Sequence, residues 1–344
     1  MTVLSYINHL YKVNNQHGFR INRRNRFFLN LHKKALSEKK LYNGTKFMYL
    51  LNRLIKYNNM RSIYFRAKHP FITALYNECK RINAVPVLNK PHEGEKAALL
   101  IGINYKGTKS ELNGSENNVY RTKEILISKY GFNDKNILVL TESEKDSKLH
   151  PNYENIMTAI GWLAKMGNNG CQTLWFQYAG HGYYVKDTNG DEADGQDECI
   201  VTNDNYAIID DHMRVALINQ LPKECKLFCF MDCCHSGTLL DLKYKYNPKS
   251  NGIVEVNQAR TNCEVISITG CRDDQVGWEA YFNNKYAGAL TWTFLKTIKS
   301  YNYKEVGLFE LINKVHAEIV KVGFDQVPQL TSSYSLNKDS TFSI

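Results

Sequence analysis

From Lys96 onward, short apolar runs rich in β-forming residues alternate with longer stretches of helical periodicity. This alternation predicts an α/β fold with a mostly parallel sheet and helices on both faces, because parallel strands need long crossover connections. The expected strands are 97–103, 137–140, 173–178, 226–231 and 264–269. The expected helices are 118–129, 152–166, 211–220, 287–300 and 308–322.

Two glycine-flanked motifs directly follow two of the expected strands. Tyr178-Ala179-Gly180-His181-Gly182 follows the strand at 173–178, and Asp232-Cys233-Cys234-His235-Ser236-Gly237 follows the strand at 226–231. The carboxyl ends of neighbouring parallel strands share one sheet edge, where ligands and chemistry collect in α/β folds. The fold should therefore bring His181 and Cys234 together at that edge.

A cysteine and a histidine at one sheet edge suit nucleophilic catalysis. An imidazole raises the thiolate fraction of a nearby thiol and can protonate a leaving amine. The N–H groups of Gly182 and Cys234 are the expected oxyanion donors. Cys233 should follow strand alternation into the core, which favours Cys234 as the nucleophile. His235 is a rival base, although a residue rarely faces its neighbour's side chain, and a buried pair without chemistry is the alternative.

The chain resembles the metacaspases, which are caspase-like cysteine peptidases, in six segments that recur in the family's order over roughly 95–335. The six segments are Ala98-Leu-Leu-Ile-Gly-Ile-Asn-Tyr, Tyr178-Ala-Gly-His-Gly, Asp187-Thr-Asn-Gly-Asp-Glu-Ala-Asp-Gly-Gln-Asp-Glu, Asp232-Cys-Cys-His-Ser-Gly-Thr, Ile268-Thr-Gly-Cys-Arg-Asp-Asp-Gln and Gly288-Ala-Leu-Thr-Trp. The resemblance implies a caspase-like fold, His181 and Cys234 as a catalytic dyad, and protein or peptide substrates. The short join between Cys234 and the fifth segment is similar to the type I arrangement.

Nine acidic residues lie between positions 187 and 211. A Ca²⁺ ion needs six to eight oxygen ligands. An EF-hand beginning at Asp187 fails, because its sixth position, which should be glycine, is Glu192. The resemblance implies instead an activating Ca²⁺ bound by Asp197, Asp210, Asp211 and Asp241. A solvated acidic loop is the alternative, especially for 187–194.

The resemblance also implies a pocket for Arg or Lys before the cut, where the chain departs from the family. Asp232 keeps the family's carboxylate. Asn118 replaces an aspartate, Ser115 a cysteine and Ala179 a serine. One carboxylate in place of two weakens bidentate recognition of a guanidinium group, so the sequence predicts an altered preference. Glu116 would compensate only if its loop turned it inward.

Residues 1–90 differ from the rest of the 344-residue chain in charge. They hold 18 Lys and Arg against two acidic residues, a net charge of +16, whereas the remaining residues carry −6. An apolar stripe at helical spacing predicts basic helices, and 85–94, with two prolines and a glycine, predicts a linker. We interpret 1–90 as a solvated appendage, a masking pro-region, or a segment that binds an acidic partner, a membrane surface or nucleic acid. The stripe consists of Phe47, Leu50, Leu51 and Leu54.

The peptidase domain is expected over 91–344, with a large-subunit-like part to about 245 and a small-subunit-like part from about 260. The segment 243–260 carries Lys243, Lys245, Lys249 and Arg260 among turn-forming residues. It is therefore a candidate for self-cleavage, as is the linker near Lys90.

Other features exclude several classes of protein. No run approaches 18 apolar residues, and the start lacks a secretory pattern. The cysteine count of nine is odd, which together with the missing secretory pattern argues against a disulfide scaffold, and the lack of a C-x-x-C pair argues against a zinc knuckle. We expect a cytoplasmic monomer, with the nucleus or a membrane surface also open.

The function that fits these features is a calcium-activated cysteine endopeptidase with an altered specificity pocket. Its alternative is a metacaspase-like regulatory or binding protein with weak or altered peptidase activity. An adaptor acting through 1–90 would explain the charge but not the dyad.

Overall fold

The computed structural model describes residues 3–17, 19–21, 26–37, 46–60, 63–65, 69–83, 95–186, 196–234, 239–258, 260–271, 279–282 and 285–344. The chain divides into two compact units, Met1–Asn89 and Lys90–Ile344. The expected linker at 85–94 lies outside the described residues. None of the helices in the described ranges is long and apolar enough to cross a membrane.

The first unit is helical and has its own core. Its elements are α1 (Val3–His17), β1 (Phe19–Ile21), α2 (Arg26–Ser37), α4 (Lys46–Met60), β2 (Ile63–Phe65) and α5 (Pro70–Asn83). The two short strands pair antiparallel. The predicted stripe on α4 is buried, and Phe47 and Leu51 pack with Phe28, Leu31 and Leu75. Burial of this stripe explains why a segment so rich in charge still folds.

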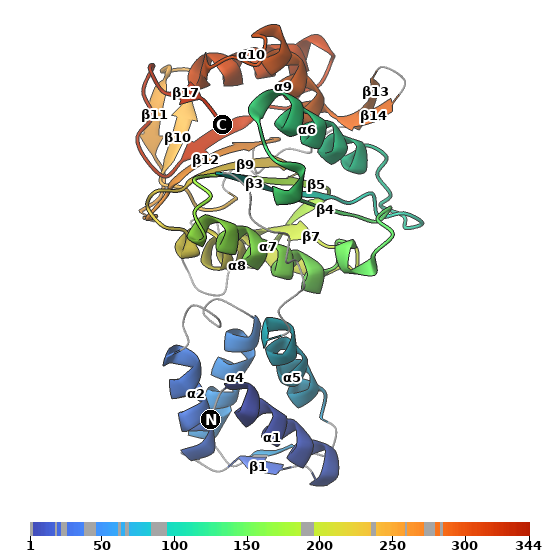
Figure 1. The fold of residues 1–344 in the computed structure, drawn as a ribbon, viewed down its shortest axis with the longest axis vertical. Coiled ribbons are helices and arrows are strands. Elements are labelled where there is room, and N and C mark those ends of the chain that lie inside the picture. Colours follow the sequence, from blue (N-terminus) through green and yellow to red (C-terminus); the bar gives the residue numbers. More distant parts are fainter. Residues whose placement is uncertain are drawn as a thin grey trace. The chain divides into compact units, whose positions relative to one another are not determined.

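The second unit is built on an eight-stranded sheet in the order β11-β10-β16-β12-β9-β5-β3-β4 (Figure 1). Five neighbouring strands are parallel: β12 (Glu264–Thr269), β9 (Lys226–Asp232), β5 (Thr173–Ala179), β3 (Lys96–Gly102) and β4 (Ile137–Thr141). Three antiparallel strands extend one side: β16 (Gln329–Ser332), β10 (Tyr244–Asn247) and β11 (Gly252–Glu255). The predicted mostly parallel α/β sheet is confirmed.

Helices cover both faces of the sheet, as predicted. One face carries α6 (Ser115–Tyr130), α9 (Ala289–Ser300) and α10 (Leu308–Lys321), and the other carries α7 (Tyr153–Asn168) and α8 (Asp210–Ala216) (Figure 1). Three 3₁₀ turns cover Asp134–Asn136, Ser147–Leu149 and Ile218–Gln220. The predicted helix at 211–220 is thus divided into α8 and a 3₁₀ turn.

Short antiparallel strands add to this framework. A three-stranded sheet consists of β6 (Gly182–Lys186), β7 (Gln196–Val201) and β8 (Ala207–Ile209). Two further pairs are β13 (Glu279–Phe282) with β14 (Lys285–Gly288), and β15 (Val306–Gly307) with β17 (Thr341–Phe342). The segment between the expected subunit-like parts forms most of the β10–β11 hairpin.

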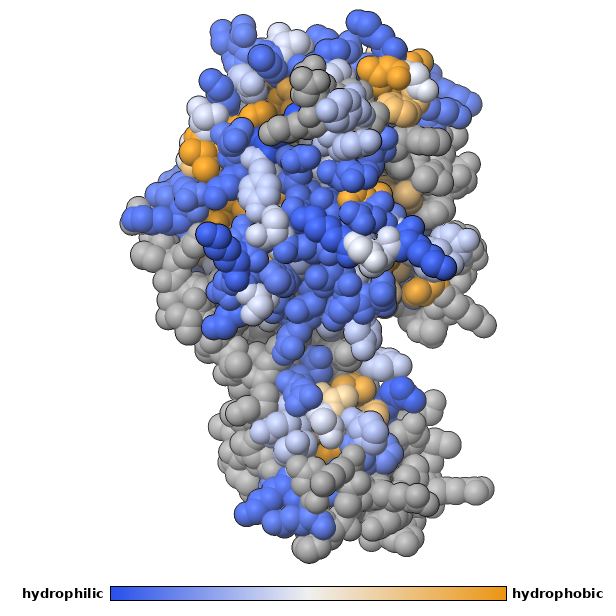
Figure 2. Space-filling view, turned by 90° about the vertical axis from the view of Figure 1, so that its right-hand side faces the viewer, coloured by the Kyte–Doolittle hydropathy of each residue, from blue (hydrophilic) through white to orange (hydrophobic). Residues whose placement is uncertain are grey.

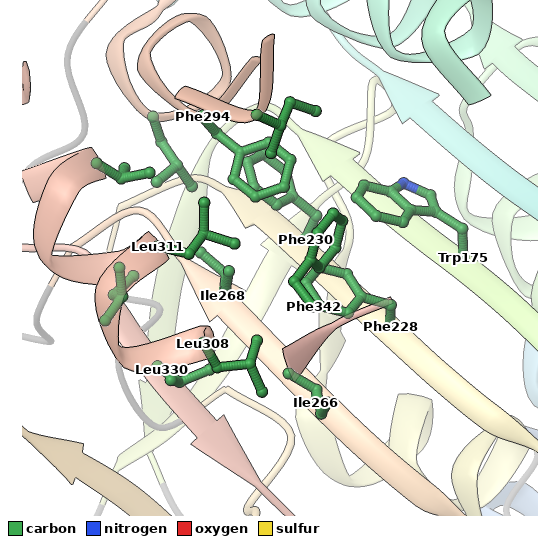
Figure 3. Packing of buried hydrophobic residues seen from close by; sticks show 14 of the residues in the cluster. Trp175, Phe228, Phe230, Ile266, Ile268, Phe294, Leu308, Leu311, Leu330 and Phe342 are labelled. Carbon is green, nitrogen blue, oxygen red and sulfur yellow. The ribbon is translucent and has the colours of Figure 1, made fainter. Parts of the chain in front are cut away.

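An aromatic core between the sheet and helices α9 and α10 fixes the strands (Figure 3). The ring of Trp175 stacks on Phe228 at 4.9 Å and on Phe230 at 5.9 Å, and Phe230 contacts Phe294 at 4.7 Å between ring centroids. Burial of each such ring stabilises the fold by roughly 2–3 kcal/mol. The strand ends that carry the motifs therefore extend from a rigid layer.

The outer surface is mainly polar on the face drawn in Figure 2. Among the residues coloured there, apolar side chains form only small, separate patches. Broad apolar patches mark obligate interfaces. That view shows none over the described residues, and the expectation of a monomer stays a prediction.

Candidate active site

The carboxyl ends of β3, β5 and β9 lie side by side. Gly102 pairs with Ala179, and Ala179 pairs with Asp232. The loop after β3, the histidine motif after β5 and the cysteine motif after β9 therefore start from one edge of the sheet.

The His181 ring is held by the loop after β3. Its Nε2 lies 2.7 Å from the carbonyl oxygen of Ser110, and its ring centroid lies 4.6 Å from that of Tyr105. Because a carbonyl only accepts hydrogen bonds, this contact assigns the proton of the neutral imidazole to Nε2 and leaves Nδ1 as the basic nitrogen. Ser110 could not be recognised from the sequence, because a backbone carbonyl has no residue signature.

The loop that presents Ser110 is itself anchored. The carbonyl of Asn104 accepts from the Leu112 N–H at 2.7 Å, and its side-chain oxygen accepts from the Glu116 N–H at 3.3 Å. The Asn104 N–H donates to Oε2 of Glu142 at 2.8 Å. These bonds fix the loop from both ends.

The two cysteines after β9 differ in exposure. Cys233 is buried at 3% relative exposure, whereas Cys234 is partly exposed. The other seven cysteines are also buried, and all nine are free thiols. The exposures favour Cys234 as the thiol that a substrate would reach. The rival base His235 lies outside the described residues.

The histidine and cysteine motifs touch through their main chains. The Gly180 N–H donates to the Asp232 carbonyl at 3.3 Å. A Cβ atom on Gly182 would overlap the carbonyl oxygen of Cys234, so a side chain at 182 would separate the two segments. His181 lies opposite Val201, whose N–H donates to the His181 carbonyl at 3.0 Å, whereas the His181 N–H donates to the Tyr105 hydroxyl at 2.9 Å. In an antiparallel ladder the next pair is not hydrogen-bonded, so the Gly182 N–H is directed away from β7.

The expected pocket residues Asp232 and Asn118 are in direct contact. The side-chain amide of Asn118 donates to Oδ2 of Asp232 at 3.1 Å, and its Oδ1 accepts from the Gly288 N–H at 3.2 Å. Ser115, one helical turn earlier on α6, and Ala179, beside Asp232 in the sheet, are both buried. The structure therefore brings the four expected pocket positions together around the start of α6.

Two neighbours of the pocket were missed from the sequence. Thr291 donates to Oδ2 of Asp232 through its N–H at 3.1 Å and its hydroxyl at 2.6 Å. Glu279 accepts from the backbone N–H groups of Asn113 and Gly114 at the start of α6, with the shortest contact at 2.8 Å. Glu279 lies in β13, whose hairpin with β14 shows no clear strand pattern in the sequence, and Thr291 lies in the first turn of α9. Glu116 does not compensate for Asn118, because its carboxylate is paired with the Lys106 ammonium at 3.1 Å.

Burial raises the pKa of Asp232 to about 6, although the hydrogen bonds from Thr291 act in the opposite direction. The nearby negative charge of Glu279 raises this pKa further. A carboxyl group in this environment gains a proton easily unless a cation approaches it.

The expected calcium residues lie on three adjoining segments. Asp197 on β7 and Asp210 at the start of α8 are 4% and 1% exposed. Burial raises the pKa of the Cys199 thiol to about 12, and the negative charges of Asp210, Glu198 and Asp197 raise it further. Asp211 follows Asp210 and donates its N–H to Oδ1 of that residue at 2.9 Å.

The fourth expected ligand, Asp241, is tied to α8 by Arg214. The Nη1 of Arg214 donates to the carbonyls of Leu240 at 2.8 Å and Asp241 at 2.9 Å. The all-oxygen donor set suits Ca²⁺. Within the described residues, however, no three Asp, Glu, His or Cys side chains converge into a ready metal group. The acidic residues at 187–194 lie outside the described ranges.

Comparison with known proteins identifies the family. Residues 96–243 match the family model described as "Metacaspase, peptidase C14 domain". The chain is 31% identical over 299 residues to Metacaspase-1 of Meyerozyma guilliermondii, covering 72% of each chain. It is 33% identical over 306 residues to Metacaspase-1 of Candida albicans, covering 72% of this chain and 67% of that one.

A solved structure of a protein from Geobacter sulfurreducens has the same fold, with a TM-score of 0.50 and 24% identity over 71% of this chain and 95% of that one. The matched relatives share the region that holds both motifs and the sheet edge between them. The chain belongs to the metacaspases, a family of cysteine-type endopeptidases.

Proposed function

We propose that the chain is a calcium-activated cysteine endopeptidase that uses Cys234 as nucleophile and His181 as general base and acid. The observation that carries this proposal is the contact between the two motifs at one sheet edge, with the His181 Nε2 proton held by the Ser110 carbonyl. That contact leaves the other ring nitrogen for proton transfer.

In the proposed reaction, Nδ1 of His181 takes the proton of the Cys234 thiol, and the thiolate attacks the carbonyl carbon of the scissile bond. The Gly182 and Cys234 N–H groups would stabilise the negative oxygen that develops. The imidazolium then protonates the leaving amine as the C–N bond breaks. Water, deprotonated by the same imidazole, hydrolyses the thioester and restores the thiol.

The pocket residues support recognition of a basic side chain with reduced strength. Asp232 supplies one carboxylate, and Asn118 supplies an amide at the position of the family's second carboxylate. A guanidinium group would be paired less strongly than by two carboxylates. We therefore propose cleavage after basic residues with a weaker preference over neutral ones.

Calcium is proposed as the activator, with Asp197, Asp210, Asp211 and Asp241 as the residues that would hold it. When bound, the ion would offset the mutual repulsion of these carboxylates. Arg214 keeps the turn with Asp241 against α8, the helix that also carries Asp210 and Asp211.

Peptide hydrolysis tests the proposal. We expect the wild type to cleave fluorogenic peptides ending in Arg in the presence of calcium. Cys234→Ala should lose turnover and labelling by a thiol-directed peptidyl inhibitor, whereas Cys233→Ala should keep most of both. Exchanged behaviour of the two variants would contradict the assignment. No turnover by the wild type would favour the regulatory alternative.

A second proposal concerns the first unit, which we infer binds a polyanionic surface: an acidic partner, an anionic membrane or nucleic acid. One of its two acidic residues, Glu78, is buried, whereas Lys12, Lys33 and Arg53 are exposed. Such an excess of positive charge attracts polyanions in a salt-dependent way. Single-stranded RNA, anionic vesicles and polyglutamate, each offered to the full chain and to a Lys12→Gln, Lys33→Gln, Arg53→Gln variant, would identify the class. If the wild type and the triple variant bound each of the three polyanions equally, the proposal would be contradicted.

A further inference from the structure

Two buried phenol groups meet beneath the main chain of His181. Tyr105 lies just after β3 and Tyr178 lies in β5, at 3% and 0% exposure. Their hydroxyl oxygens are 2.8 Å apart. Neither residue is a ligand, nucleophile or base in the proposed reaction.

The two hydroxyls hold both backbone groups of His181. The His181 N–H donates to the Tyr105 hydroxyl at 2.9 Å, and the Tyr178 hydroxyl donates to the His181 carbonyl at 2.7 Å. Both hydroxyls also lie within 2.9 Å of the Val201 carbonyl at the end of β7. Two hydroxyl protons are therefore shared among His181, Val201 and the hydroxyl pair itself, in a cluster shielded from water.

The glycine of the histidine motif makes room for this pair. A Cβ atom on Gly180 would stand 2.6 Å from the Tyr178 hydroxyl and 2.9 Å from the Tyr105 hydroxyl. Separations this short are not tolerated between non-bonded heavy atoms. A side chain at 180 would therefore displace the hydroxyls from His181.

Tyr105 also contacts the imidazole ring. Its own ring lies 4.6 Å from that of His181 at an interplanar angle of 35°, while Ser110 of the same loop accepts from Nε2. Tyr105 has a φ of +51°, which is rare for a bulky residue, and Thr108 secures it by donating its N–H and hydroxyl to the Tyr105 carbonyl at 3.1 and 2.8 Å. Backbone strain of this kind persists where surrounding contacts enforce it, and it is concentrated at functional sites.

The phenols remain neutral in this environment. Burial raises the pKa of Tyr105 and of Tyr178 far above the ordinary value. Neutral hydroxyls can both donate and accept, which the arrangement requires. Their role is thus to hold His181 and not to exchange protons with it.

We infer that Tyr105, assisted by Tyr178, is a positioning residue that fixes the backbone and ring plane of His181 relative to Cys234. This inference rests on the proposed dyad. Loss of the Tyr105 hydroxyl would leave the His181 N–H without its acceptor and loosen the imidazole, while the substrate pocket around Asp232 would be unchanged.

Three hydroxyl deletions test the inference: Tyr105→Phe, Tyr178→Phe and, as a matched control, Tyr246→Phe. The Tyr246 hydroxyl is also hydrogen-bonded on both sides, to Asn251 at 2.7 Å and Asn313 at 2.9 Å, but it lies on β10. We expect Tyr105→Phe and Tyr178→Phe to lower kcat about ten- to hundredfold with little change in KM. The control should match the wild type.

Alkylation of Cys234 by iodoacetamide supplies a readout independent of turnover, because the other eight cysteines are buried. A well-placed imidazole sustains thiolate below the ordinary thiol range. We expect the midpoint of the pH profile to rise by about one unit in Tyr105→Phe and Tyr178→Phe. Unfolding curves show whether each variant folds. If either Tyr105→Phe or Tyr178→Phe fails to fold, the kcat and the alkylation profile of the other variant test the inference.

Profiles and kcat values equal to those of the control in both variants would overturn the inference. If the wild type hydrolyses no peptide, the proposed function fails, and the alkylation profiles still decide whether the tyrosines position His181. The two failures are thereby distinguished.

Discussion

The side-chain amide of Asn118 donates a 3.1 Å hydrogen bond to Oδ2 of Asp232. Together with the two bonds from Thr291, it surrounds this oxygen with neutral donors. The family resemblance implies a second carboxylate at position 118, whereas this chain has there an amide that donates to the first carboxylate. The pocket therefore carries at most one negative charge among these residues.

Asn118→Asp should increase the preference for Arg. Two carboxylates in contact hold one proton between them until a cation displaces it. The second charge-assisted bond should raise the ratio of kcat/KM for Arg over Gln about ten- to hundredfold, and Asp232→Asn should lower the ratio. The neighbouring substitution Asn117→Asp serves as control, since Asn117 donates to the Tyr286 carbonyl at 3.1 Å and not to Asp232. If the ratio of kcat/KM for Arg over Gln were unchanged in Asn118→Asp, residue 118 would not line the substrate pocket.

The raised pKa of Asp232 should make stability depend on pH. The folded carboxyl titrates at about 6, against an ordinary value of 3.8. Between pH 3.8 and pH 6 the folded protein keeps a proton on Asp232 that the unfolded chain has lost. The contribution of this group to the free energy of unfolding is therefore fully present below pH 3.8 and is lost as the pH rises through 6. The loss is about 3 kcal/mol at most. Urea unfolding of the wild type and Asp232→Asn at pH 4 and pH 7 measures it, and a difference between them that does not change with pH would disprove the assignment.

Calcium binding should depend on Asp210. We expect Asp210→Asn to weaken binding in calorimetry by at least about tenfold, because one of the four expected carboxylates is lost. Asp204→Asn is the matched control, since Asp204 instead accepts from the Tyr153 N–H at 3.0 Å. Equal heats from wild type and Asp210→Asn, or peptidase activity indifferent to a chelator, would refute the calcium proposal.

Self-cleavage should favour Lys249 within the segment 243–260. Lys249 lies in the exposed turn between β10 and β11, whereas Lys245 is paired with Val254 and Thr331 in the sheet. Lys243 is paired with Glu255 at 3.4 Å. Mass spectrometry after calcium addition should show a cut after Lys249 that is absent in Cys234→Ala. An intact chain that still cleaves peptides would contradict this prediction alone.

The elements predicted best from the sequence are the buried parallel strands. The strand Glu264–Thr269 has the predicted bounds, because a strand covered on both faces appears as a continuous apolar run. The stripe on α4 was predicted equally directly from its spacing.

The short antiparallel strands escaped prediction. β6, β13 and β14 carry exposed tyrosines at 183, 184, 281 and 286. Because these apolar side chains face solvent, the sequence lacks the alternation of buried apolar and exposed polar residues that marks a half-buried strand. The helix expected from 287 begins at Ala289, because the preceding residues belong to β14.

Some parts of the candidate site could be predicted from the sequence and others could not. Glycine-flanked motifs after apolar runs indicate strand ends, which is why the sequence placed His181 and Cys234 at the ends of neighbouring strands. The contact between Asn118 and Asp232 joins residues 114 positions apart, and only the family resemblance pointed to it. The Ser110 carbonyl and the tyrosine hydroxyls act through geometry that no local pattern encodes.

The β10–β11 hairpin has a consequence for a cleaved molecule. A cut at its turn would leave β10 on one fragment, paired on both sides with strands of the other, β11 and β16. The adjacent parallel pair of β9 and β12 would also join the two fragments. Scission of the backbone would thus yield two chains held together by one shared sheet, and the sheet edge that carries His181 and Cys234 would stay intact.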